Sequence, residues 1–175
     1  SRFSNGIVLS NNTITSSYTA IDNEFSHNSI INDNFITGKL NMYGINFKLS
    51  ENSDISYNTI ERISCPTYSN EWQILLRGEH ALNSTIKNNN INSYVGYCDA
   101  RKLQTISTDN SIVEDNNIIS HLGWSGGHIQ TVIFDHQNST ILNNNFTVHE
   151  GTSNSNNYTG FVIDSNGDDS NNNQL

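Results

Sequence analysis

A nine-residue phrase returns six times along this 175-residue chain, and this repetition limits the fold more than any other feature. The copies begin 22 to 31 residues apart, and they are GIVLSNNTI (6–14), NSIINDNFI (28–36), NSDISYNTI (52–60), NSTIKNNNI (83–91), NSIVEDNNI (110–118) and NSTILNNNF (138–146). A repeat this short cannot bury an apolar face alone, so successive copies must stack into a continuous core. We therefore expect a solenoid in which each copy belongs to one coil.

Three positions of the phrase are nearly constant in character. The fourth is β-branched or leucine and the ninth is apolar, which predicts two inward stacks of side chains. The seventh is always asparagine, in a column made of Asn12, Asn34, Asn58, Asn89, Asn116 and Asn144. Asparagine tolerates the left-handed conformation, and its amide both donates and accepts hydrogen bonds. Because coils stack about 4.8 Å apart, we expect a left-handed Asn corner between two strands, with the amides bonded in a ladder.

The phrase resembles the repeat of right-handed parallel β-helices in the pectate-lyase-like superfamily, including NosD-type repeats. The resemblance covers nearly the whole chain, and it implies an all-β solenoid of about six coils with three short strands in each. It does not fix the function, because that superfamily includes lyases, hydrolases, epimerases, phage tailspikes and adhesins. We expect one domain over residues 1–164 and a polar tail over 165–175, in a segment of a longer chain or a protomer of an assembly such as a homotrimer.

Composition excludes several other classes. The chain has one proline and 31 asparagines, without the periodicity of a long helix. It contains no apolar stretch long enough to span a bilayer, so we expect no membrane insertion. The net charge is −9, and its eight lysines and arginines are scattered, whereas phosphate binding needs clustered basic residues. Nucleic acid is therefore not an expected partner.

A third strand fills the rest of each coil, most clearly at 43–49, 71–77, 103–108, 130–135 and 159–164. Period-two alternation points Ile45, Phe47 and Leu76 inward. It also predicts an outward row near the end of this strand, one residue per coil, made of Lys48, Arg77, Asp109, Asp135 and Asp164.

Variable loops between the phrase and the third strand gather on one side of the solenoid, where repeat proteins often bind ligands. They carry or border aromatic residues, including Trp72 and Trp124, which could stack on sugar rings. Two alternatives stay open: the rings could merely cover the sheet edge, and Trp72 has the inward parity of Ile74.

Two cysteines, Cys65 and Cys98, occupy corresponding loops of successive coils and could form a disulfide. A disulfide would indicate an oxidising compartment, and hence an extracellular location or the surface of a cell or virion. The alternative is two unrelated thiols. Metal binding by the pair is not expected, because no suitable Cys or His spacing accompanies it.

The outward row holds the candidate catalytic groups: Asp109 and Asp135 as an acid and base pair, with His136 and Arg77 as secondary groups. Carboxylates on adjacent coils would lie about 5 Å apart at the backbone. Lys48, Asp164, Trp72 and Trp124 are the candidate substrate contacts. No cofactor is required, although the same carboxylates could hold Ca²⁺, which prefers oxygen ligands. The alternative is that these residues are solvated strand ends.

Two main classes of function follow. The first is an extracellular protein that binds or degrades a polysaccharide, by lyase elimination or glycoside hydrolysis. The second is a non-catalytic shaft or adhesin, such as a segment of a phage tailspike or of a cell-surface protein. A lesser alternative is a uronate C5-epimerase, because IFDH (133–136) is similar to the Asp-Pro-His motif of mannuronan C5-epimerases, although the proline is missing and Val132 replaces the tyrosine of that motif.

Overall fold

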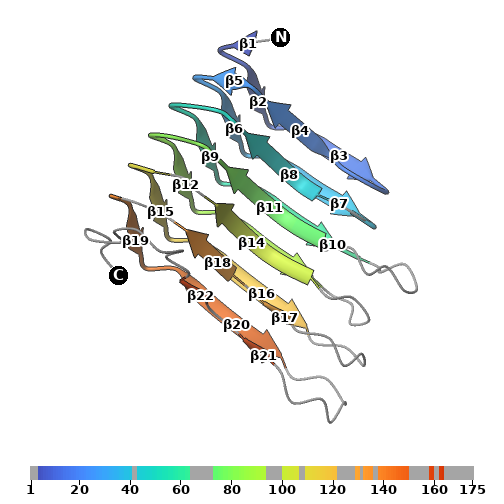
Figure 1. Ribbon diagram of the computed structural model, residues 1–175. Helices are drawn as coiled ribbons and strands as arrows, with labels where there is room; N and C mark the ends of the chain where they lie inside the picture. The colour runs from blue at the N-terminus through green and yellow to red at the C-terminus, as the bar shows by residue number, and fades with distance from the viewer. Residues whose placement is uncertain are drawn as a thin grey trace.

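The computed structural model describes residues 4–40, 43–63, 73–93, 100–106, 109–121, 129–130, 132–135, 138–149, 158–159 and 162–163. Within these ranges the regular structure is β-strand, and parallel strands stack coil upon coil from the N-terminal to the C-terminal end (Figure 1). The predicted all-β solenoid is therefore confirmed. No helix in the described part of the chain is long and apolar enough to cross a membrane.

Three six-stranded parallel sheets form the sides of the solenoid, and each coil contributes one strand to each sheet. The first sheet contains β2 (Val8–Ser10), β6 (Ile30–Asn32), β9 (Asp54–Ser56), β12 (Thr85–Lys87), β15 (Ile112–Glu114) and β19 (Thr140–Leu142). The second contains β3 (Thr13–Ser16), β7 (Phe35–Gly38), β10 (Thr59–Arg62), β13 (Asn90–Ser93), β16 (Asn117–His121) and β20 (Asn145–His149).

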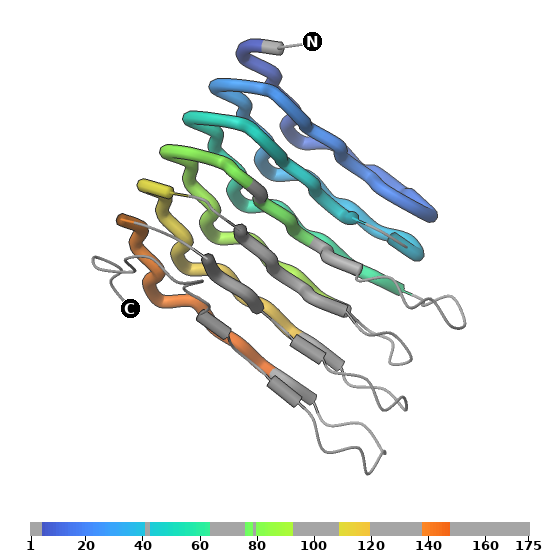
Figure 2. Tube along the Cα trace, in the orientation of Figure 1, coloured from blue at the N-terminus to red at the C-terminus, as the bar shows by residue number. Residues whose placement is uncertain are grey.

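The third sheet contains β4 (Ile21–Glu24), β8 (Tyr43–Lys48), β11 (Gln73–Glu79), β14 (Ala100–Ile106), β18 (Val132–Asp135) and β22 (Val162–Ile163). Two short pairs complete the fold: β1 (Ser4–Asn5) with β5 (Ser26–His27), and β17 (Ile129–Gln130) with β21 (Tyr158–Thr159). The tube in Figure 2 follows the same coils. The expected polar tail, residues 165–175, lies outside the described residues.

Identical positions of the phrase overlie one another, as the sequence predicts. In the first sheet the fourth positions pair in register from Leu9 to Ile141, and the stack is fully buried at Ile31, Ile55, Ile86 and Val113. The ninth positions pair in the second sheet through Ile36, Ile60, Ile91, Ile118 and Phe146. Both inward stacks are therefore confirmed.

The third sheet closes the core. Ile45, Phe47 and Leu76 are all buried, which confirms their inward direction. Gly78 pairs with Phe47, and a Cβ atom added there would lie 2.5 Å from Cζ of Phe47. The glycine therefore leaves the space that the phenylalanine ring occupies between coils.

Each coil turns at left-handed residues, but the expected left-handed Asn column is wrong by one position. The left-handed residue is the sixth of the phrase, with φ between 53° and 59°, at Asn11, Asp33, Tyr57, Asn88, Asp115 and Asn143. None of the six ladder asparagines that follow has a positive φ. The bend precedes each ladder residue, whose amide is then free to point into the solenoid.

The asparagine ladder itself is confirmed. Each amide nitrogen from Asn12 to Asn116 donates to Oδ1 of the asparagine one coil further on, over 2.8 to 3.1 Å. The same oxygen accepts a backbone N–H of the preceding coil, over 3.0 to 3.1 Å. From Asn34 to Asn144 each amide nitrogen also donates to a backbone carbonyl of the preceding coil, over 2.8 to 3.0 Å. The buried amides are thus satisfied on every side.

A second polar ladder is formed by serine at the second position of the phrase. The backbone N–H groups of Ser53, Ser84 and Ser111 donate to the serine hydroxyl one coil further on, over 3.1 to 3.3 Å. Each of the three hydroxyls donates to the carbonyl two residues earlier. These serines are buried, and they satisfy the backbone where the chain enters the first sheet.

Candidate functional site

The predicted outward row does not exist as one row. Lys48 pairs with Glu79, whereas Arg77 pairs with Asn46, two residues earlier along the strand. Asp135 pairs with Ile106, and Asp109 follows Ile106 by three residues, beyond the strand. The predicted separation of about 5 Å between the backbones of Asp109 and Asp135 on adjacent coils is therefore wrong. Alternation fixes which face a side chain takes, but it does not fix register between strands of unequal length.

Most other predicted site residues lie outside what the structure describes. For Asp135 only the backbone is described, as the last residue of β18. Further residues outside the described ranges are His136, Trp72, Trp124, Asp164, Cys65 and Cys98. The structure therefore describes the side chains of Lys48, Arg77 and Asp109 alone among the predicted site residues.

Arg77 lies on the outer face of the third sheet. Its Nη1 donates to the hydroxyl of Tyr43 over 2.6 Å, and its guanidinium lies over the Tyr43 ring, 5.3 Å from the centroid. On the neighbouring coil Asn46 donates to Asp22 over 2.7 Å. Such contacts hold the guanidinium in place.

Arg62, in the second sheet, is by contrast fully buried, and this burial lowers its pKa to about 10.

Asp109 belongs to the corner between the third and first sheets. Glu51 forms an isolated bridge with Leu82, and the carbonyls of Glu51, Leu82 and Asp109 accept equivalent backbone N–H groups from the preceding coil. These contacts define an outer column along the solenoid axis: His27, Glu51, Leu82 and Asp109. Two residues earlier in each coil stands an inner column: Phe25, Leu49 and His80.

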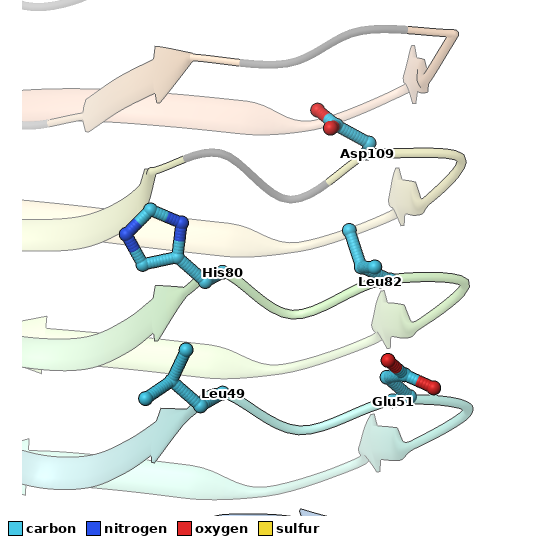
Figure 3. A pocket seen from close by; sticks show the side chains of 5 residues that line it. All are labelled: Leu49, Glu51, His80, Leu82 and Asp109. Carbon is cyan, nitrogen blue, oxygen red and sulfur yellow. The ribbon is translucent and has the colours of Figure 1, made fainter.

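A groove of about 360 Å³ lies between these columns, and we call it the corner groove. Its lining residues are Leu49, Glu51, His80, Leu82 and Asp109. In Figure 3 Leu49 and His80 stand one above the other, as do Glu51, Leu82 and Asp109. The two carboxylates therefore flank Leu82 along the axis, two coils or about 10 Å apart at the backbone.

The inner column has an unusual backbone. Phe25, Leu49 and His80 have φ of 57°, 52° and 50°, a conformation that bulky side chains rarely adopt. At the first and sixth positions of the phrase, which are also left-handed, the residue is mostly asparagine or aspartate, and the left-handed Leu40 is fully buried in the core. Phe25 and Leu49 are 40% and 37% exposed, so burial in the core does not explain these apolar residues. Strain of this kind often accompanies a functional surface.

The corner groove combines acceptors with apolar surface. His27 Nδ1 lies 3.9 Å from Glu51 Oε2, and both side chains are partly exposed. Leu49 and Leu82 supply apolar walls, while the carboxylates of Glu51 and Asp109 can accept hydrogen bonds. In the described ranges no three His, Cys, Asp or Glu side chains come together as a metal site. Such a surface suits a ligand with hydroxyl groups and apolar faces.

Sequence reasoning found Asp109 but missed the other residues of the groove. A positional signal was present, because Glu51, Leu82 and Asp109 each immediately precede a copy of the phrase. Leu49 and His80 stand three residues before their copies. Extending the alignment of the copies upstream would have shown both columns, though not the left-handed backbone.

Comparison of the chain with protein-family models, curated proteins and solved structures finds no match in any of the three.

Proposed function

We propose that the protein binds a polysaccharide whose chain lies along the solenoid axis in the corner groove. The observation that carries this proposal is the inner column, where exposed Phe25, Leu49 and His80 occupy left-handed positions. Asparagine could adopt this backbone conformation, as it does elsewhere in the coil, so the backbone does not require phenylalanine, leucine or histidine here. We attribute their presence to contacts that their side chains make with a ligand.

The chemistry of the groove suits sugars. A pyranose ring has apolar C–H faces, which pack on side chains such as Leu49, and hydroxyls at its edge, which can donate to the carboxylates of Glu51 and Asp109. Because equivalent backbone positions recur at every coil, a polymer with a regular repeat can place one ring beside each coil along the axis. The likeness of the phrase to the pectate-lyase-like superfamily supports the same class of ligand, and with it an extracellular location.

A second candidate function is hydrolysis of the bound chain. Inverting glycosidases place an acid and a base roughly 6.5 to 9.5 Å apart. The carboxylates of Glu51 and Asp109 come from alternate coils, about 10 Å apart at the backbone. That separation favours an inverting over a retaining arrangement.

A panel of soluble polysaccharides tests both functions, with binding measured by calorimetry and cleavage by release of reducing ends. Leu49→Asn combined with His80→Asn should abolish binding, because it removes the ring contacts and keeps residues suited to the left-handed backbone. Tyr57→Asn is the matched control, since Tyr57 is 54% exposed and left-handed at a different corner. Equal binding by all three proteins would exclude the groove as the site. The absence of any ligand in the panel would favour a non-catalytic shaft.

A further inference from the structure

We infer that the corner groove selects neutral polysaccharides and rejects polyuronates. This inference rests on the proposed function, and it names the class of ligand. The charges of the groove carry it: two carboxylates, Glu51 and Asp109, line the site together with Leu49, Leu82 and His80.

Among the described residues beside the groove, the charged side chains do not reverse this charge. Lys48, which precedes Leu49, pairs in register with Glu24 of the neighbouring coil, so its ammonium stands beside an acidic residue. At the N-terminal end of the outer column His27 Nδ1 lies 3.9 Å from Glu51 Oε2, so this imidazole faces a carboxylate of the groove. The whole chain carries −9.

A polyuronate has a carboxylate on every ring. A chain lying along the axis would place successive rings about one coil apart. A uronate beside Leu82 would then lie about one coil, or about 5 Å along the axis, from both Glu51 and Asp109. Like charges at that distance repel, and removing water from between them strengthens the repulsion. A neutral chain instead offers hydroxyls, each of which can donate to these same carboxylates.

Three pairs of hexasaccharides isolate charge from ring shape, and they are the hexamers of cellulose and β-1,4-glucuronan, of β-1,4-mannan and polymannuronate, and of α-1,4-galactan and polygalacturonate. For the unaltered protein, calorimetry should show at least one pair in which the neutral hexasaccharide binds more tightly than its uronate partner, by a factor of about ten or more in the dissociation constant. Affinity for the uronate should increase with added salt, because salt screens repulsion, whereas affinity for the neutral chain should change little.

Glu51→Gln combined with Asp109→Asn should reduce the difference within the pair to about two-fold, since the repelling charges are gone. The matched control is Asp33→Asn with Asp115→Asn, which removes the same charge at another corner, where Asn11, Asn88 and Asn143 occupy equivalent positions. This control should retain the full preference for the neutral chain.

The outcomes separate the inference from the function on which it rests. A uronate that binds as tightly as its neutral partner overturns the charge selection but leaves polysaccharide binding intact. An equal loss of preference in the control variant also overturns it, because net charge rather than the groove would then decide. If no member of any pair binds, and the wider panel also gives no ligand, the proposed function itself is overturned.

Discussion

Two corners of each coil solve the same bending problem with different residues. Between the first and second sheets the chain bends at a residue that is mostly asparagine or aspartate, and a fully bonded asparagine such as Asn89 follows it. Between the third and first sheets it bends twice: first at Phe25, Leu49 or His80, whose side chains stand at the surface, and three residues later at an asparagine such as Asn52. The first corner therefore uses the residues that local stability favours, whereas the first of the two bends at the second corner does not.

The difference shows where the solenoid is constrained by folding and where it is free to carry function. At the Asn corner each amide has partners on the coils before and after, so a change in one coil is felt by its neighbours. At the corner groove the outer column varies from His27 to Glu51, Leu82 and Asp109 without breaking the backbone pattern. A repeat protein can thus change a binding surface at one corner while keeping another corner fixed.

The largest effect is expected at the Asn corner. Asn89→Ala should lower the free energy of unfolding by about 3 kcal/mol, because it leaves buried partners on both neighbouring coils unsatisfied. Asn89 donates to Asn116 and to the Ile55 carbonyl, and its oxygen accepts the amide and the backbone N–H of Asn58. Urea denaturation measures the change. A loss below about 0.5 kcal/mol would show that the ladder does not hold this corner.

The serine ladder on the groove side should contribute less. Ser84→Ala is expected to cost about 1 kcal/mol, because the hydroxyl makes two hydrogen bonds, to the Leu82 carbonyl and from the Ser53 N–H. The same denaturation experiment measures it, and Ser111→Ala one coil further on should cost at least as much, because that hydroxyl also bonds to the Ala81 carbonyl. If Ser84→Ala costs as much as Asn89→Ala, the two corners are equally constrained and the comparison fails.

Much of this fold could be predicted from the sequence, because the phrase aligns with itself. Once the copies are superimposed, Ile86 must stack between Ile55 and Val113, and Asn89 must stack against Asn58. Stacking then fixes the core and the ladder together. The left-handed position was misplaced by one residue, because asparagine also occupies the sixth position in Asn11, Asn88 and Asn143, and residue type alone does not separate a bend from a ladder.

The site could not be predicted in the same way. The third strand has no phrase of its own, and β8 and β11 differ in length, so Arg77 was aligned with Lys48 when it pairs with Asn46. A slip of two residues preserves the inward parity of Ile45 and Leu76 but moves every outward charge to another row. Asp109 lines the corner groove, yet the residues that line it with Asp109, such as Glu51 and His80, come from other coils.

A smaller effect of opposite sign is expected at the inner column. Leu49→Asn should raise the free energy of unfolding by about 0.5 kcal/mol, because asparagine adopts the left-handed conformation at lower cost than leucine. The mirrored change at the Asn corner, Asn88→Leu, should lower it by about 1 kcal/mol for the same reason. Thermal and urea unfolding of both variants measure the pair. Destabilisation by Leu49→Asn would mean that Leu49 is there for packing rather than for a ligand.

The smallest effect is expected where the same ladder chemistry occurs on the outer surface. Next to the buried ladder, Asn117 donates to Asn90 over 3.0 Å, and Asn145 donates to Asn117 over 2.9 Å, on the outer face of the second sheet. Asn90→Ala should cost at most about 0.5 kcal/mol, because water replaces hydrogen bonds lost from a partly exposed side chain. Asn89 and Asn90 are adjacent, identical and both part of a ladder, so the ratio of their costs isolates burial. Equal costs would show that stacking of amides, and not their burial, makes the Asn corner the more constrained of the two.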